Sequence, residues 1–208
     1  MSAAPLFVTL EGIDGSGKST QARRLAEALR AQGREVVLTR EPGGSPGAED
    51  IRKLLTEGPP DRWSPETETL LFTAARRDHL ERVIAPALAR GAVVICDRFA
   101  DSTRMYQGLR GEGLRELVDR LHAMMIGREP DLTLLIDIEP KTGLDRALAR
   151  QGGEDRFEGF GAGLQARLRQ GFLDLAHAEP GRFAVIDGGR GADAVAADIL
   201  DVVTSRVA

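Results

Sequence analysis

The sequence has little cysteine, no excess of positive charge and no long apolar run. Its 208 residues contain one cysteine, Cys96, so no disulfide can form within the chain, and we expect a reducing, cytoplasmic location. The net charge of −4 gives no general electrostatic reason to bind nucleic acid or an anionic membrane. No apolar run approaches the roughly 18 residues of a membrane span. Residues 1–5 lack the basic and apolar regions of a signal peptide.

Lysine is also scarce, although arginine is abundant. Only three of the 28 basic residues are lysine, so an arginine counts as a functional signal only where its position supports it. None of the three lysines follows an asparagine, which excludes the guanine-reading N-K-x-D motif of GTP-dependent switches.

The most informative motif lies near the N-terminus. Gly12–Ser19 matches G-x-x-x-x-G-K-[ST], in which glycines let backbone N–H groups curl around phosphates. Lys18 would reach the β- and γ-phosphates, and the Ser19 hydroxyl would ligate Mg²⁺. An apolar run at 6–10 precedes the loop and a helical pattern follows it, so the positive end of a helix faces the phosphates. The residues expected to bind ATP are Gly12, Ile13, Asp14, Gly15, Ser16, Gly17, Lys18, Ser19 and Thr20.

Short apolar runs alternate with helical patterns along the chain. The runs predict strands at 6–10, 35–40, 92–97, 132–137 and 183–187, each covered on both faces. Helical spacing covers about 18–32, 47–57, 66–89, 113–126, 141–150, 162–178 and 192–206, and Pro86 is expected to kink or split the third of these. The alternation predicts a three-layer α/β P-loop NTPase fold, in which helices flank a five-stranded parallel sheet, built as one domain over residues 1–208.

Polar motifs follow the second and third runs, where a parallel sheet binds its ligands. Arg40–Gly44 follows the second run. The third ends in Asp97, a Walker B pattern whose carboxylate would hold Mg²⁺ together with Ser19. A helix cap or turn former is the alternative for Asp97. Arg98 would grip a second phosphate or, alternatively, form a surface ion pair.

A glycine-rich, charged stretch at 151–163 separates two predicted helices. With Arg150 and Arg156 it is typical of a mobile lid, at about 150–163, that brings arginine to the γ-phosphate and excludes water. A solvated loop is the equal alternative.

Several motifs together resemble the bacterial thymidylate kinase family of P-loop nucleoside monophosphate kinases. They occur in one order over nearly the whole chain and are Glu11–Thr20, Arg40–Gly44, Asp97–Phe99, Ser102–Gly108, Leu132–Asp137 and Gly143–Ala147. The resemblance implies Mg²⁺-dependent transfer of the γ-phosphate of ATP to dTMP, giving dTDP and ADP, by a homodimer. No general base is needed, because the dTMP phosphate has a second pKa of about 6 and is largely ionised near neutral pH.

The resemblance also implies roles for particular residues. Asp14 would bind the sugar 3′-hydroxyl or order the acceptor phosphate region, Arg98 would hold the dTMP phosphate, and Glu41 and Pro42 would border the acceptor site. Phe72 would stack on thymine, and Arg76 would contact the carbonyl edge of the base. Tyr106 would pack against the sugar where a ribose 2′-hydroxyl would sit, and Gln107 is a weaker candidate nearby. The implied catalytic residues are Lys18, Asp14, Arg98, Arg150 and Arg156. From composition and spacing alone, Phe72 would belong to the core and Arg76 to a solvated helix face.

Two positions depart from patterns of the family. One branch has an arginine within the P-loop after the Asp, where this chain has Gly15, so the resemblance places the catalytic arginine in the lid. Arg104 stands where many relatives have glutamine, and it would either alter base contacts or face solvent. The Glu41-Pro42 bond is a candidate for the cis form, as at the corresponding turn in relatives.

Two other functions share the P-loop. A kinase for another nucleoside monophosphate or a small metabolite would keep the fold and lid and change only the acceptor pocket. An ATP-driven binding protein fits less well, because many hydrolysing ATPases have a second acidic residue after the Walker B Asp, where this chain has Arg98.

Overall fold

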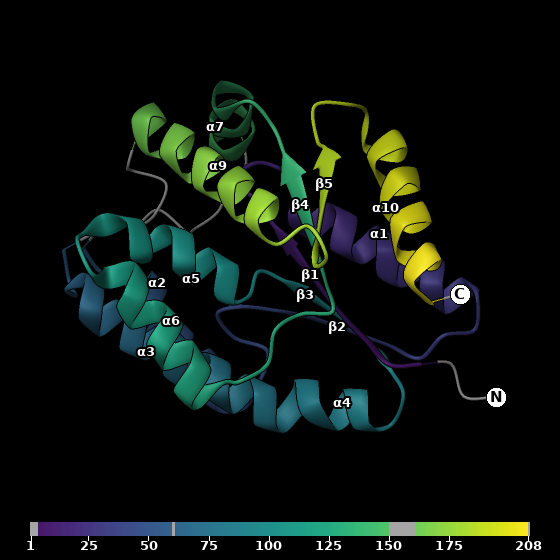
Figure 1. Ribbon diagram of the computed structural model, residues 1–208, viewed down its shortest axis with the longest axis horizontal. Coiled ribbons are helices and arrows are strands. Elements are labelled where there is room, and N and C mark those ends of the chain that lie inside the picture. Colours follow the sequence, from purple (N-terminus) through teal and green to yellow (C-terminus); the bar gives the residue numbers. More distant parts are fainter. Residues whose placement is uncertain (1–3, 60, 150–160, 208) are drawn as a thin grey trace.

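Five parallel strands form the centre of the molecule, and helices lie around them (Figure 1). This computed structural model describes residues 4–59, 61–149 and 161–207. The strands are hydrogen-bonded in the order β2-β3-β1-β4-β5, and every pairing is parallel. Their bounds are Leu6–Glu11 for β1, Val36–Arg40 for β2, Val93–Asp97 for β3, Leu132–Asp137 for β4 and Phe183–Asp187 for β5. The predicted α/β fold is confirmed.

The register of the strands brings the polar motifs to one edge of the sheet. Asp97 at the end of β3 lies beside Leu10 of β1 on one side and Arg40 of β2 on the other. The P-loop begins directly after β1, so the loop, Asp97 and the Arg40–Gly44 turn meet at the carboxyl edge.

Helical segments connect the strands, as parallel pairing requires. Their bounds are Lys18–Ala31 for α1, Pro46–Thr56 for α2, Pro65–His79 for α3, Leu80–Ile84 for η1, Ala85–Ala89 for α4, Ala100–Tyr106 for α5, Gly108–Arg110 for η2, Leu114–Met125 for α6, Pro140–Leu148 for α7, Gly161–Ala178 for α9 and Ala192–Val207 for α10. Within the described ranges, no helix is long and apolar enough to cross a membrane.

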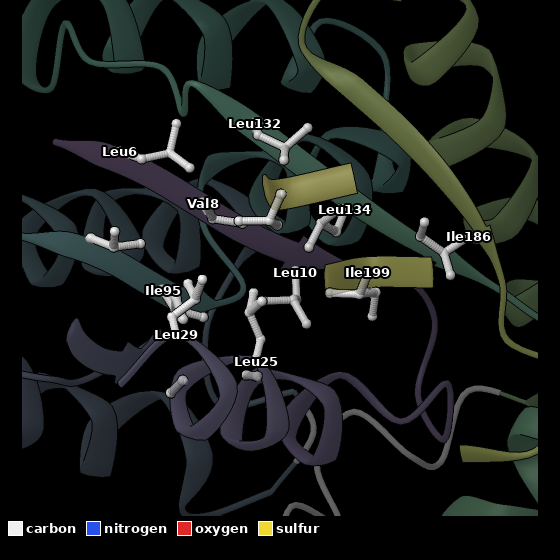
Figure 2. Packing of buried hydrophobic residues seen from close by; sticks show 14 of the residues in the cluster. Leu6, Val8, Leu10, Leu25, Leu29, Ile95, Leu132, Leu134, Ile186 and Ile199 are labelled. Carbon is white, nitrogen blue, oxygen red and sulfur yellow. The ribbon is translucent and has the colours of Figure 1, made fainter. Parts of the chain in front are cut away.

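Apolar side chains bury both faces of the sheet. On one face, Leu25 and Leu29 lie one helical turn apart on α1 and pack with Val8 of β1 and Ile199 of α10 (Figure 2). Phe7 alternates with Val8 along β1 and belongs to a separate cluster on the opposite face. Burying one such side chain contributes about 1.5–3 kcal/mol, so these clusters hold β1 and α1 firmly on either side of the P-loop.

Three local features differ from the sequence prediction. The edge strands are only partly covered, since each has a single neighbour, and Val185 of β5 is 51% exposed. The predicted helix at 66–89 is split into α3, η1 and α4. The π-helical turn η1 ends two residues before Pro86, whose ring and missing N–H oppose regular helical bonding. The sequence prediction missed α5, because its seven residues carry no clear apolar period.

Candidate active site

The P-loop wraps around the amino group of Lys18. Gly12, Gly15 and Gly17 have positive φ angles of 137°, 76° and 97°, which side chains disfavour. Lys18 Nζ donates hydrogen bonds to the carbonyl oxygens of Gly12 at 3.0 Å and Ile13 at 2.8 Å. The loop therefore places a buried ammonium group beside the N-terminus of α1, and both attract phosphate.

The environment of Lys18 favours the arrival of an anion. Burial, followed by the positive charge of Arg98, lowers the pKa of Lys18 to about 8. Negative charges on Asp14, Asp97 and Glu11 act in the opposite direction but do not offset this. A bound phosphate would stabilise the charged ammonium, so phosphate binding and protonation of Lys18 are coupled.

The P-loop touches α7 backbone to backbone. A Cβ atom on Gly15 would lie 2.0 Å from the carbonyl oxygen of Gly143, and one on Gly143 would lie 2.6 Å from that of Asp14. An arginine at position 15 therefore does not fit unless α7 moves, which gives a physical reason for the missing P-loop arginine.

Ser19 and Asp97, the two predicted Mg²⁺ ligands, lie in contact. Ser19 Oγ donates a hydrogen bond to Asp97 Oδ2. Asp97 Oδ1 is buried and has no hydrogen-bond partner among the described residues. Hydroxyl and carboxylate oxygens are the hard ligands that Mg²⁺ prefers, so this pair of side chains fits the ion.

An open pocket with about 570 Å³ of empty space lies beside the P-loop, between α3 and α5. It brings together all residues that the resemblance assigns to the acceptor, namely Asp14, Glu41, Pro42, Phe72, Arg76, Arg98, Tyr106 and Gln107. Phe72 is half-buried and lines the pocket rather than the core. The Glu41-Pro42 peptide at its border is cis.

Arg98, Asp14 and Tyr106 form one hydrogen-bonded group on the wall of this pocket. The two oxygens of Asp14 accept from Arg98 Nη2 and, at 3.1 Å, from the Tyr106 hydroxyl. Burial tends to raise the pKa of Asp14, but Arg98 and Lys18, with the hydrogen bonds, keep it below its usual value. Arg98 has a φ of 70°, a backbone strain that persists only where the surroundings fix the residue. The group therefore holds a fixed cation at the pocket.

Gln165 of α9 joins this group, and the sequence prediction missed it. Its Nε2 donates to Asp14 Oδ2 at 3.4 Å. Its Oε1 is buried without a hydrogen-bond partner in the described part of the chain. Nothing in the sequence distinguishes this glutamine from its neighbours on a regular helix.

Arg76 is buried rather than solvated, at 4% exposure. Its Nε donates to Glu41 Oε2 at 2.7 Å, and its Nη2 donates to the Phe99 carbonyl at 3.1 Å and to Thr103 Oγ1 at 3.0 Å. Nη1 has no hydrogen-bond partner among the described residues, and the side chain lines the acceptor pocket. Arg76 therefore offers one donor group, in a fixed direction, to whatever binds there.

Arg104 differs from both expectations. It is 6% exposed and forms ion pairs with Asp101 at 2.7 Å, Asp119 at 2.9 Å and Glu129. Neither a base contact nor a solvent-facing position was correct, because these three carboxylates surround the side chain and it does not line the acceptor pocket. Gln107 does line the pocket, and its Nε2 donates to the buried Glu68 at 3.3 Å.

A second pocket also borders the P-loop. Its walls include Gly15, Gly17, Thr20, Arg146, Gly188 and Arg190. Arg146 Nη1 donates to the Gly188 carbonyl at 3.3 Å, and Gln21 Nε2 donates to the Ala192 carbonyl at 3.0 Å, which ties the loop after β5 to α7 and α1. Sequence reasoning missed Arg146 and Arg190, because arginine is too common in this chain to be informative.

The predicted lid is only partly within the described residues. Arg150 and Arg156 lie outside them, so their role stays a prediction. The remaining lid positions, 161–163, form the start of α9.

A phosphate-binding loop between two pockets, on the carboxyl edge of a parallel sheet, defines a P-loop nucleotide-binding protein built for phosphoryl transfer. Comparisons with known proteins show which family of this class the chain resembles. The family model for thymidylate kinase matches residues 10–199. The thymidylate kinase of Ruegeria pomeroyi is 70% identical over 207 residues, which cover 100% of this chain and 98% of the relative. The thymidylate kinase of Dinoroseobacter shibae is 68% identical over 198 residues, or 95% and 96% of the two chains.

A solved structure agrees with these relatives. The crystal structure of thymidylate kinase from Ehrlichia chaffeensis superimposes with a TM-score of 0.78 at 36% identity, covering 97% of this chain and 99% of that one. The chain belongs to the thymidylate kinase family.

Proposed function

We propose that the protein transfers the γ-phosphate of ATP to dTMP, giving dTDP and ADP. The observation that carries the proposal is the acceptor pocket, where Arg98 and Arg76 offer fixed donors at the wall of one cavity beside the P-loop. The second pocket, with Arg146 and Arg190, would take the base of ATP. The P-loop between them would hold the phosphates that pass from one nucleotide to the other.

Catalysis consists of positioning and charge neutralisation. Lys18 would contact the transferred phosphoryl group, and Arg98 would hold the acceptor phosphate through a planar, bidentate contact. Mg²⁺ held by Ser19 and Asp97 would supply further neutralisation of phosphate charge. The residues need not remove a proton, because the acceptor phosphate is already largely ionised at neutral pH.

The position of Arg76 favours a pyrimidine that has a carbonyl group on the edge facing this arginine. Its Nη1 can only donate hydrogen bonds, and it lines the pocket. It would donate to the carbonyl oxygen of thymine, whereas cytosine has an amino group at that position, which cannot accept the bond. A panel of monophosphates tests this. Faster ADP formation with dTMP than with dCMP, dGMP or AMP supports the proposal, whereas equal rates would leave only a kinase of broader acceptor range.

Tyr106 and Gln165 support a contact between Asp14 and a sugar hydroxyl at the same site. Both donate to Asp14, whose oxygens would otherwise be free to bind the sugar hydroxyl in several orientations. Tyr106→Phe keeps the ring and removes the hydroxyl. We expect it to raise the KM for dTMP through a looser Asp14, and an unchanged KM would contradict this role.

The lid is proposed to supply the catalytic arginine. The proposal draws its support from the resemblance and from Gly15, where the contact with Gly143 leaves no room for a side chain. Arg150→Ala and Arg156→Ala should lower kcat more than they weaken ATP binding. If both variants keep wild-type kcat, the catalytic arginine lies elsewhere.

An ATP-driven binding protein remains the contrasting function. It predicts fast ATP hydrolysis without an acceptor, whereas a kinase holds hydrolysis low until dTMP arrives. ADP release measured with and without dTMP separates the two.

We also propose a homodimer, located in the cytoplasm, which the single cysteine favours. Leu70 of α3 and Met124 and Met125 of α6 are 55%, 76% and 45% exposed, and the two helices meet where Arg77 Nη1 donates to the Met125 carbonyl at 2.8 Å. A second copy of the chain would cover this apolar face. Light scattering should show a dimer that Leu70→Glu disrupts. The matched control, Val185→Glu, changes an equally exposed side chain on β5 and should leave the dimer intact.

A further inference from the structure

His79 is a completely buried histidine at the end of α3 that does not line the acceptor pocket. Both of its ring nitrogens have partners. Nε2 lies 2.7 Å from Thr39 Oγ1 on β2, and Nδ1 lies 3.0 Å from Glu41 Oε1 in the turn after β2. A Cβ atom on Gly44 would lie 2.5 Å from Nε2, so the same turn packs directly against the ring.

The partners of the two ring nitrogens show which nitrogen of His79 carries a hydrogen. A carboxylate can only accept, so Nδ1 carries the hydrogen that Glu41 Oε1 receives. With Nδ1 as donor, a neutral imidazole has Nε2 as acceptor, and the Thr39 hydroxyl donates to it. His79 therefore fixes the orientation of the Glu41 carboxyl group from one side.

The other oxygen of Glu41 fixes Arg76. Glu41 Oε2 accepts from Arg76 Nε at 2.7 Å, and both side chains are 4% exposed. Arg76 Nη2 is held by the Phe99 carbonyl and Thr103, so Glu41 and α5 together decide where Nη1 points. Without the bond from His79, Glu41 Oε1 loses its partner and the carboxyl group keeps its bond to Arg76 through Oε2, so the direction of Nη1 is set less firmly from the β2 side.

We propose that His79 is a positioning residue for base selection, acting through Glu41 on Arg76. The inference rests on the proposed function, since it concerns the donor that would face the pyrimidine carbonyl. Loss of the His79–Glu41 bond should therefore weaken dTMP use and reduce the preference for dTMP over dCMP, while the ATP side stays intact. A merely structural histidine would affect stability, or both substrates alike.

Two amide variants measure the hydrogen bonds of the two imidazole nitrogens separately. The amide nitrogen of asparagine lies near the position of Nδ1, so His79→Asn retains a donor to Glu41 and loses the contact with Thr39. Glutamine places its amide near Nε2, so His79→Gln retains the Thr39 contact and loses Glu41. We expect His79→Gln to raise the KM for dTMP about tenfold, the effect of losing one hydrogen bond to a charged group. His79→Asn should stay close to wild type, and both variants should keep the wild-type KM for ATP.

Each outcome decides the question. A wild-type KM and an unchanged dTMP/dCMP preference in His79→Gln would overturn the inference, as would equal losses in the two variants. Failure of the unmodified protein to phosphorylate dTMP, with another monophosphate accepted, would instead refute the proposed function.

A measurement on the wild-type protein covers the case in which His79→Gln does not fold. ¹⁵N NMR of the imidazole reports which nitrogen carries the hydrogen. A protonated Nδ1 that shifts when dTMP is added supports the inference, and a ring protonated only at Nε2 contradicts it.

Discussion

Replacing Glu11 by glutamine should change how the stability of the protein depends on pH. Glu11 is the last residue of β1 and is completely buried. Its Oε1 accepts from the backbone N–H of Phe99 at 2.7 Å and of Ser102 at 3.3 Å, and its Oε2 accepts from Ser102 Oγ at 2.6 Å. The carboxyl group therefore joins the strand before the P-loop to the segment that carries Arg98.

Burial, and then the negative charge of Asp101, raises the pKa of Glu11 from 4.5 to about 7. The hydrogen bonds from Ser102 and Phe99 and the charge of Arg98 offset only part of this. The folded chain then binds more protons than the unfolded chain between these two pH values. The resulting stability is fully present below pH 4.5 and is lost as the pH rises through 7. A shift of this size corresponds to about 3 kcal/mol.

Denaturant unfolding of wild type and Glu11→Gln, from pH 5 to pH 8, measures this effect. Glutamine does not titrate, so the free energy of unfolding of wild type should fall relative to the variant by about 2–3 kcal/mol over that range. Glu116→Gln, at an exposed position of α6, is the matched control and should follow the wild-type pH dependence. Parallel curves for wild type and Glu11→Gln would contradict a raised pKa of Glu11 in the folded chain.

Three further substitutions test the site and its support. Lys18→Ala should lower kcat by about 10²–10³-fold with the fold intact by circular dichroism, because it removes the cation from the transferred phosphate; wild-type turnover would exclude Lys18 from the reaction. Arg98→Ala should raise the KM for dTMP in steady-state assays, and an effect confined to ATP would contradict its place at the acceptor. Arg104→Gln should lower the free energy of unfolding in urea titration by about 1.5–3 kcal/mol, since the buried carboxylate of Asp101 loses its charged bond from Arg104 but keeps Arg182, and an unchanged free energy would mean that the Arg104 ion pairs contribute nothing.

The sheet and the P-loop were predictable because they depend on local patterns. Continuous apolar runs such as 132–137 occur where both faces of a strand are buried, and these predicted the central strands correctly. Phosphate binding imposes fixed spacing, so Gly12–Ser19 was visible without any tertiary information.

The parts of the site that were missed depend on contacts between distant segments. The sequence cannot show that Arg104 meets Glu129, or that Gln165 reaches Asp14 across 151 positions of the chain. Arg146 and Arg190 carried no signal in an arginine-rich chain, and only the fold places them at one pocket. Arg76 is similar, since the resemblance suggested the contact but the structure provides the reason for its direction.

The most direct test of the proposed reaction is the identity of its products. Purified protein with ATP, Mg²⁺ and dTMP can be followed by ³¹P NMR, which distinguishes dTDP, ADP and inorganic phosphate. We expect dTDP and ADP in equal amounts, formed faster than the diphosphates of dCMP, dGMP or AMP under the same conditions. Release of ADP and inorganic phosphate without dTDP, or a faster reaction with another monophosphate, would contradict it.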